Sequence, residues 1–142
     1  MRNIGWLAAL AMVGTGVPVT IGWTAPTIEP SVWVATATPD RAARETGELP
    51  FDDHLSFERG QVSSRIGGKR GFPAGTYTLS QIRPGTLSLT IQQQSSRHGE
   101  MTWSLDIVGA ALQGLLIWTT PEGEHHTFQV LGHRESGEAP AQ

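Results

Sequence analysis

The chain contains no cysteine, and this absence excludes disulfide bonds, thiol catalysis, cysteine-ligated zinc and a lipid anchor attached through cysteine. Small disulfide-free domains must fold by burying apolar surface, or gain stability from a partner or a second copy. Seventeen glycines and nine prolines indicate many turns. These features favour a single small, turn-rich domain.

Charged side chains are missing from residues 3–28, which follow Arg2. The apolar run over residues 4–13, with small residues after it, is typical of an export signal. Residues 4–23 are long enough for a membrane-spanning helix of about 20 apolar residues, which leaves an uncleaved anchor as the alternative. We therefore expect residues 1–25 to be a signal peptide or membrane anchor. The protein is then exported, and is either periplasmic or secreted.

Two small-x-small sequences are candidate cleavage sites for such a signal. Gly14-Thr15-Gly16 lies close to the apolar run, and Ala35-Thr36-Ala37 lies farther along the chain. The sequence leaves open which of them is cut, and whether the segment is cut at all.

The remaining chain divides by composition into three parts. Residues 26–49 are rich in Pro and Thr at their start and are expected to form a linker. Within this linker, Pro39 to Arg44 is expected to form a short helix that stops at Gly47. Residues 50–135 carry the patterned domain, and residues 136–142 form a polar tail that we expect to be disordered.

Apolar and polar residues alternate along several short segments of the patterned domain. The clearest alternation runs from Met101 to Ile107, and the stretch from Leu112 to Thr120 is apolar on both faces, as in a barrel wall. About seven such segments follow one another at spacings of roughly ten residues, separated by turn signals. The pattern predicts an all-β domain, a small antiparallel meander or barrel of about seven or eight strands. The interior of such a barrel is filled by side chains or holds one small ligand.

Several segments resemble a group of small exported bacterial proteins of unassigned function. The segments are residues 52–60, 63–65, 71–72, 75–78, 98–103 and 109–118. In that group a Cys often follows the Ser-Ser pair, and here Gly67 or a neighbour stands in its place, so any role of that Cys is absent. The likeness covers about residues 51–134 and implies a broadly lipocalin-like fold, without implying an activity.

Acidic side chains are absent from Arg59 to Gly99, where six basic residues occur, whereas Glu100 onward has six acids and one base. Basic and acidic strands could lie side by side and neutralise one another. Alternatively, Arg65, Lys69 and Arg70 form a glycine-rich basic loop that binds an anion, because glycines let backbone N–H groups converge. The loop lacks the G-K-[ST] ending of a phosphate-binding loop. Lipid head groups and polysaccharide phosphates are the anions that an exported protein would meet.

Two tryptophans lie on expected strands. Trp103 and Trp118 are expected in the core, and the alternative places them at a barrel mouth facing an apolar ligand. Together with Arg65, Lys69 and Arg70 they are the candidate residues for binding a ligand or anion.

A catalytic site is not evident. Asp53, His54, Ser63 and Ser64 supply the residue types of a Ser-His-Asp triad, but no G-x-S-x-G elbow accompanies them. We therefore name no catalytic residue.

A metal site is not expected either. His125 and His126 are adjacent on one expected strand and point to opposite faces, so they cannot share a metal. We expect no metal and no cofactor.

The sequence favours a non-enzymatic module of the cell envelope. Its partner is a small apolar ligand, an anionic envelope surface or another protein, and a nucleic acid is not expected. The alternative is an envelope hydrolase or an enzyme inhibitor. A pocket with converging polar side chains would favour catalysis.

Overall fold

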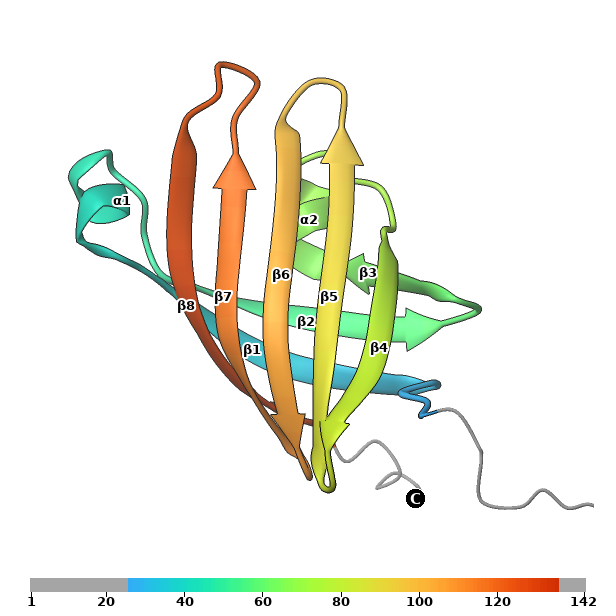
Figure 1. Cartoon of the computed structure of the whole chain (residues 1–142). Coiled ribbons are helices and arrows are strands. Elements are labelled where there is room, and N and C mark those ends of the chain that lie inside the picture. The colour runs from blue at the N-terminus through green and yellow to red at the C-terminus, as the bar shows by residue number, and fades with distance from the viewer. Residues whose placement is uncertain (1–25, 136–142) are drawn as a thin grey trace, which may run out of the picture.

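The computed structural model describes residues 26–135, in which eight antiparallel strands form a nearly closed barrel (Figure 1). The strands are β1 (Ser31–Pro39), β2 (Phe51–Glu58), β3 (Gln61–Ser64), β4 (Thr76–Arg83), β5 (Thr86–Ser95), β6 (Gly99–Val108), β7 (Ala111–Thr119) and β8 (His125–Arg134). Their order in the sheet is β3-β2-β1-β8-β7-β6-β5-β4. The predicted all-β meander or barrel of seven or eight strands is therefore confirmed.

The two ends of the sheet meet at one point. Val62 of β3 and Gly75, just before β4, form an isolated antiparallel bridge. The amide of Val62 donates to the carbonyl of Gly75 over 3.1 Å, and the amide of Gly75 donates back over 2.8 Å. The strand β3 has only four residues, with the turn from β2 before it and α2 directly after it, so the pairing does not extend beyond this bridge. The barrel is thus closed by pairing at one position only.

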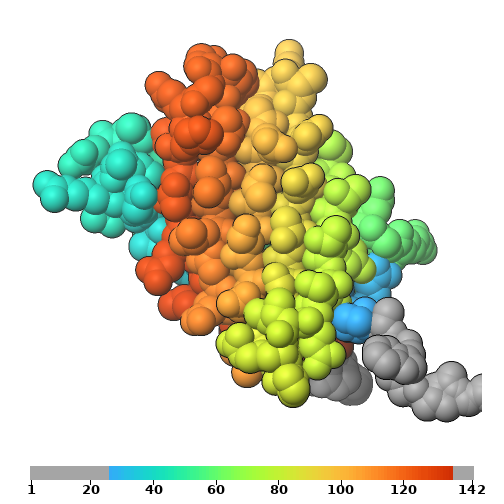
Figure 2. Space-filling model, viewed as in Figure 1, coloured from blue at the N-terminus to red at the C-terminus, as the bar shows by residue number. Residues whose placement is uncertain are grey.

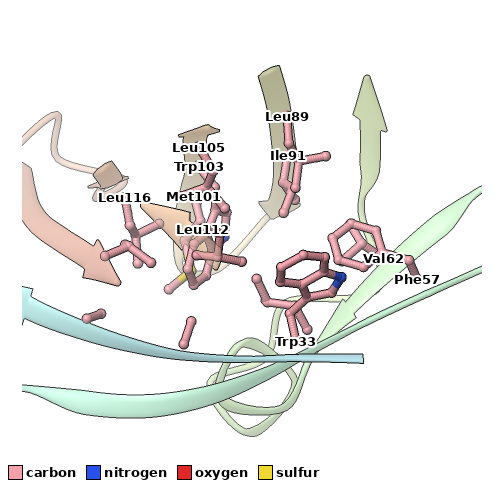
Figure 3. Close-up of a cluster of buried hydrophobic side chains, with 14 of the residues drawn as sticks. Trp33, Phe57, Val62, Leu89, Ile91, Met101, Trp103, Leu105, Leu112 and Leu116 are labelled. Carbon is pink, nitrogen blue, oxygen red and sulfur yellow. The ribbon is translucent and has the colours of Figure 1, made fainter. Parts of the chain in front are cut away.

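The interior of the barrel is filled by large apolar side chains. Along β6, Met101, Trp103, Leu105 and Ile107 are buried, and the residues between them face outward, as the period of two predicts. Figure 3 shows Trp103 in this cluster together with side chains from β1, β2, β5 and β7. The expectation that Trp103 belongs to the core is confirmed.

The expected linker over residues 26–49 is wrong for its first half. Ser31–Pro39 is strand β1, which lies between β2 and β8 and pairs with both. Trp33, Ala35 and Ala37 point into the core. The sequence did not indicate this strand, because two of its four buried residues are alanines, which carry little apolar signal, and a third is Pro39. The barrel therefore begins at β1 rather than at residue 50.

Two short helices lie outside the sheet. Helix α1 (Arg41–Glu45) confirms the expected helix, but Asp40 rather than a proline begins it, since its carboxylate accepts the amide of Ala43 over 2.8 Å. Helix α2 (Arg65–Lys69) occupies a stretch that the glycines indicated to be a loop. Figure 2 shows α1 projecting beside β8, at the edge of the outer face formed by β4 to β8.

The expected signal or anchor over residues 1–25 and the expected tail over residues 136–142 lie outside the described residues. Neither α1 nor α2, the helices of residues 26–135, has the length and apolar character needed to cross a membrane.

Candidate functional site

A pocket of about 440 Å³ lies at one end of the barrel, within the range of about 300–1,000 Å³ that small-molecule sites have. We call it the barrel-end pocket. It is lined by Glu48, Lys69, Arg70, Gly71, Phe72, His98 and Trp118. Its residues come from the segment before β2, the end of α2 with the turn after it, the β5–β6 turn and the end of β7. The β5–β6 and β7–β8 turns both lie at this end of the barrel, at the top of Figure 1.

Arg70 lines the barrel-end pocket and lies over two aromatic rings. Its guanidinium carbon lies 5.2 Å from the ring centroid of Phe51 and 5.8 Å from that of Trp118. Both distances are in the range of a cation–π contact. Among residues 26–135, its guanidinium has no carboxylate and no hydrogen-bond acceptor as a partner. Two aromatic rings therefore hold a half-buried cation whose N–H groups are free.

Helix α2 brings Lys69 and Arg70 to the pocket, and its start is fixed by two buried side chains. The hydroxyl of Ser64 accepts the amide of Gly67 over 2.8 Å, and the carboxylate of Asp53 accepts the amide of Ile66 over 2.9 Å. Ser64 also donates its hydroxyl proton to Asp53. Burial raises the pKa of Asp53, and the hydrogen bond from Ser64 and those from backbone amides oppose this effect.

The chain leaves α2 through a turn that requires glycine. Gly71 has a φ of +91°, in the region that favours glycine. A Cβ at this position would lie 2.8 Å from Cδ2 of His98. The amide of Phe72 then donates to the carbonyl of Gly67 over 2.7 Å. The absence of a side chain at Gly71 thus lets His98 lie against the turn and line the same pocket.

Trp118 is held in place on several sides. Its indole N–H donates to the backbone carbonyl of His98 over 2.7 Å. Its ring centroid lies 5.2 Å from that of His126, with an angle of 32° between the planes. His126 is the partner of Trp118 on β8 and is itself buried, and its Nδ1 lies 3.3 Å from the hydroxyl of Thr46. These contacts join the β5–β6 turn, β7, β8 and the segment after α1 into one wall.

The pocket contains more positively than negatively charged side chains. Lys69 and Arg70 contribute two cations and Glu48 one carboxylate, so the lining carries more positive than negative charge. Within residues 26–135, none of these three side chains forms an ion pair. An anion that enters the pocket therefore meets free cationic donors beside aromatic surface.

The structure brings together three of the five candidate binding residues, namely Lys69, Arg70 and Trp118. Trp103 is fully buried in the core and donates its indole N–H to Gln93 over 2.9 Å. Arg65 lies at the opposite end of α2, where it lines a separate depression with His54. Neither Trp103 nor Arg65 contributes to the barrel-end pocket.

Sequence reasoning missed most of the other pocket residues. Glu48, Phe72 and His98 line the pocket, and Phe51 supports Arg70. Glu48 and His98 are fifty positions apart, and no local motif connects them. The one available signal was Phe72, an aromatic residue that follows the basic loop closely in sequence.

The residue types of a triad do not assemble into one. Ser64 donates directly to the buried Asp53, with no imidazole between them. His54 lies on the opposite face of β2, and its Nε2 is 3.8 Å from the carboxylate of Glu135. Asp53 and Ser64 therefore anchor α2, and they lack the geometry of nucleophilic catalysis.

The comparisons with known proteins give no further identification. No family of proteins, no curated protein and no solved structure was found to match this chain.

Proposed function

We propose that the protein is a non-enzymatic binding module that holds a small anionic ligand in its barrel-end pocket. The observation that carries the proposal is the position of Arg70, between Phe51 and Trp118 and without an acceptor among residues 26–135. A guanidinium presents several N–H groups in one plane and binds carboxylate or phosphate through two of them.

The aromatic contacts prepare Arg70 for such a ligand. A long cationic side chain normally loses rotamer freedom when it binds an anion, and this loss weakens binding. Stacking against Phe51 and Trp118 restricts the side chain before the ligand arrives. Lys69 lies next in sequence on the same lining and adds positive charge.

The ligand also needs an apolar part. Phe72 and Trp118 line the pocket and offer ring surface beside the cations. The interior of the barrel below is occupied by side chains such as Trp103 and Leu116, which are fully buried. A compact ligand with one apolar group and one carboxylate or phosphate suits this pocket better than a long-chain lipid.

The proposal includes the cell envelope as the place of action. Its support is the uncharged segment before residue 29, with the apolar run over residues 4–13, which is typical of an export signal. The lipocalin-like resemblance stays a prediction.

The test is a binding titration with matched small probes. We would use 3-phenylpropanoate, phenyl phosphate and the uncharged 3-phenylpropanamide with the full-length chain in mild detergent. We expect the two anions to bind and the amide to bind at least tenfold more weakly, since a hydrogen bond to a charged group contributes about 1.5–3 kcal/mol. Arg70→Gln should weaken anion binding roughly tenfold to hundredfold. Arg70→Lys keeps the charge and loses the planar guanidinium, so its affinity for the anions should lie between those of the wild type and Arg70→Gln.

Arg97→Gln is the matched control, because Arg97 is exposed on the β5–β6 turn and does not line the pocket. It removes the same charge and should leave binding unchanged. Binding to phosphatidylglycerol vesicles shows whether the phosphate that the pocket accepts belongs to a lipid head group. Binding of phenyl phosphate without binding to the vesicles indicates a free anion. Equal binding of anions and amide, or equal binding by the wild type and Arg70→Gln, would overturn the proposal.

A further inference from the structure

The barrel-end pocket contains one carboxylate as well as two cations. Glu48 is half-buried and lines the pocket together with Arg70. Its backbone amide donates to the carbonyl of Ala43 over 3.1 Å, which holds the residue just after α1. Its carboxylate has no hydrogen bond or ion pair with any of residues 26–135.

Opposite charges that share a pocket would normally pair with each other. Here the guanidinium of Arg70 lies over the rings of Phe51 and Trp118, and the backbone amide of Glu48 is bonded to the end of α1. The two groups line the same pocket without forming an ion pair, and each keeps its hydrogen-bonding capacity. A half-buried charge without a partner is unfavourable, and a ligand that satisfies both charges removes this cost.

We infer that the ligand of the barrel-end pocket is a zwitterion, with its anionic group at Arg70 and Lys69 and its ammonium group at Glu48. The inference rests on the proposed function, because the same pocket and the same anion contact are used. The apolar part of the ligand lies against Phe72 and Trp118. Amino acids with an apolar side chain have this chemistry, and aminoalkyl phosphates share it.

Charge balance also favours a zwitterion over a simple anion. A simple anion would satisfy Arg70 but would face the carboxylate of Glu48 across the same pocket. Like charges at short range disfavour one another, particularly where water is partly excluded. An ammonium group on the ligand turns that repulsion into an attraction, so it should add affinity and select against ligands without it.

The experiment compares three probes that share one phenyl ring and one short chain. L-Phenylalanine carries both charges, 3-phenylpropanoate carries the anion only, and 2-phenylethylamine carries the cation only. With the full-length chain in mild detergent, we expect L-phenylalanine to bind roughly fivefold to tenfold tighter than 3-phenylpropanoate. 2-Phenylethylamine should bind the most weakly of the three, since Lys69 and Arg70 outnumber Glu48. Glycerophosphoethanolamine distinguishes a phosphate zwitterion from an amino acid.

The variant Glu48→Gln should reverse the preference. It removes the partner of the ammonium group and the repulsion toward the anion, so L-phenylalanine binds more weakly and 3-phenylpropanoate more tightly. Glu45→Gln is the control, because Glu45 is exposed on α1, pairs with Arg41 and does not line the pocket. Its binding should match that of the wild type.

Two failures can be told apart. If 3-phenylpropanoate binds through Arg70 but L-phenylalanine and the phosphate zwitterion gain nothing, the zwitterion inference is overturned and the anion site stands. If Glu48→Gln leaves the order of the probes unchanged, the inference is overturned in the same way. If no probe binds at all, the proposed function fails together with the inference.

Discussion

The indole N–H of Trp103 donates to Oε1 of Gln93 over 2.9 Å inside the barrel. Both side chains are almost completely buried, at 0% and 1% exposure. The contact fixes the orientation of the Gln93 amide, because only its oxygen can accept the indole proton. Nε2 of Gln93 consequently has no partner, the one such buried side-chain atom found among residues 26–135.

Because Trp103 and Gln93 are hydrogen-bonded to each other, substitutions at the two positions should have strongly non-additive effects on the free energy of unfolding. Trp103→Phe and Gln93→Met should each lower the free energy of unfolding, since Trp103→Phe leaves the Gln93 amide without a partner and Gln93→Met leaves the indole N–H without one. The loss of one partner costs about 1–3 kcal/mol. The double variant removes both polar groups and should be less destabilised than the sum of the two single variants. Chemical denaturation of all four proteins measures the coupling, and additive losses would contradict it.

Trp103→Ala should cost about 3–5 kcal/mol in the same assay, because it leaves a cavity in the core.

The buried carboxylate of Asp53 should make stability depend on pH. Burial raises its pKa above the ordinary 3.8, so the folded state binds this proton more tightly than the unfolded state. Its contribution to stability is therefore present below pH 3.8 and is lost as the pH rises through the folded pKa. Asp53→Asn cannot ionise. The free energy of unfolding of the wild type should therefore fall relative to that of Asp53→Asn as the pH rises from acid toward neutral.

Urea denaturation at several pH values tests this difference. Asp52→Asn controls for net charge, because Asp52 is exposed and bonds the hydroxyl of Thr36 on the outer face. If the free energies of unfolding of the wild type and Asp53→Asn differ by the same amount at every pH, the pKa of Asp53 is not raised in the folded state.

Tyr77 is the only tyrosine of the chain, so its ionisation can be read directly. Burial, with the hydrogen bond to Glu29 and the charge of Glu29, raises the pKa of Tyr77 to about 12. Absorbance titration should give a midpoint near that value, and Glu29→Gln should lower it toward 10. The phenol contributes stability that is present below pH 10 and lost as the pH rises through about 12.

Circular dichroism at the same pH values would show that the barrel is still folded during the titration. A midpoint near 10 in folded wild-type protein would disprove the contact with Glu29.

Removal of β1 should abolish folding. The chain from residue 26 onward should give a β-type circular dichroism spectrum and a cooperative melt. The chain from residue 50 onward lacks Trp33 and the strand that joins β2 to β8. The β2–β3 hairpin would then have no neighbour in the sheet except at the bridge of Val62 and Gly75. A cooperative β-type melt of the shorter chain would show that β1 is dispensable.

Export can be tested by fractionation and intact mass. Expressed with its own N-terminus, the protein should be found outside the cytoplasm. Cleavage after Gly16 would leave β1 whole, whereas cleavage after Ala37 would remove Trp33 from the core. We therefore expect a mass that corresponds to cleavage near Gly16 or to the uncleaved chain. Full-length protein that stays soluble in the cytoplasm would refute export.

The strand pattern could be predicted from the sequence wherever inward positions carry large apolar residues. Met101, Trp103 and Leu105 alternate with polar neighbours, and that alternation specifies both a strand and its buried face. Turn positions such as Gly99, with a φ of +97°, were recognisable because few other residues adopt that conformation. These are local properties of the chain, so the sequence by itself determined the all-β class and the approximate number of strands.

Tertiary structure decided what local patterns could not show. Ala35 and Ala37 became core residues only because β2 and β8 lie on either side of β1. Helix α2 formed despite its glycines because Asp53 and Ser64 bind its first amide groups. Such effects depend on neighbours distant in sequence, which override weak local preferences.

The candidate site shows the same division. The sequence identified Lys69 and Arg70 as basic residues without nearby acids, since charge and spacing are visible in one dimension. It could not indicate that Phe51 and Trp118 hold Arg70, or that Glu48 lies on the same lining. Those relations arise when the sheet curves until its two ends meet at Val62 and Gly75, because only that curvature brings the start of β2, the end of α2 and the end of β7 to one end of the barrel.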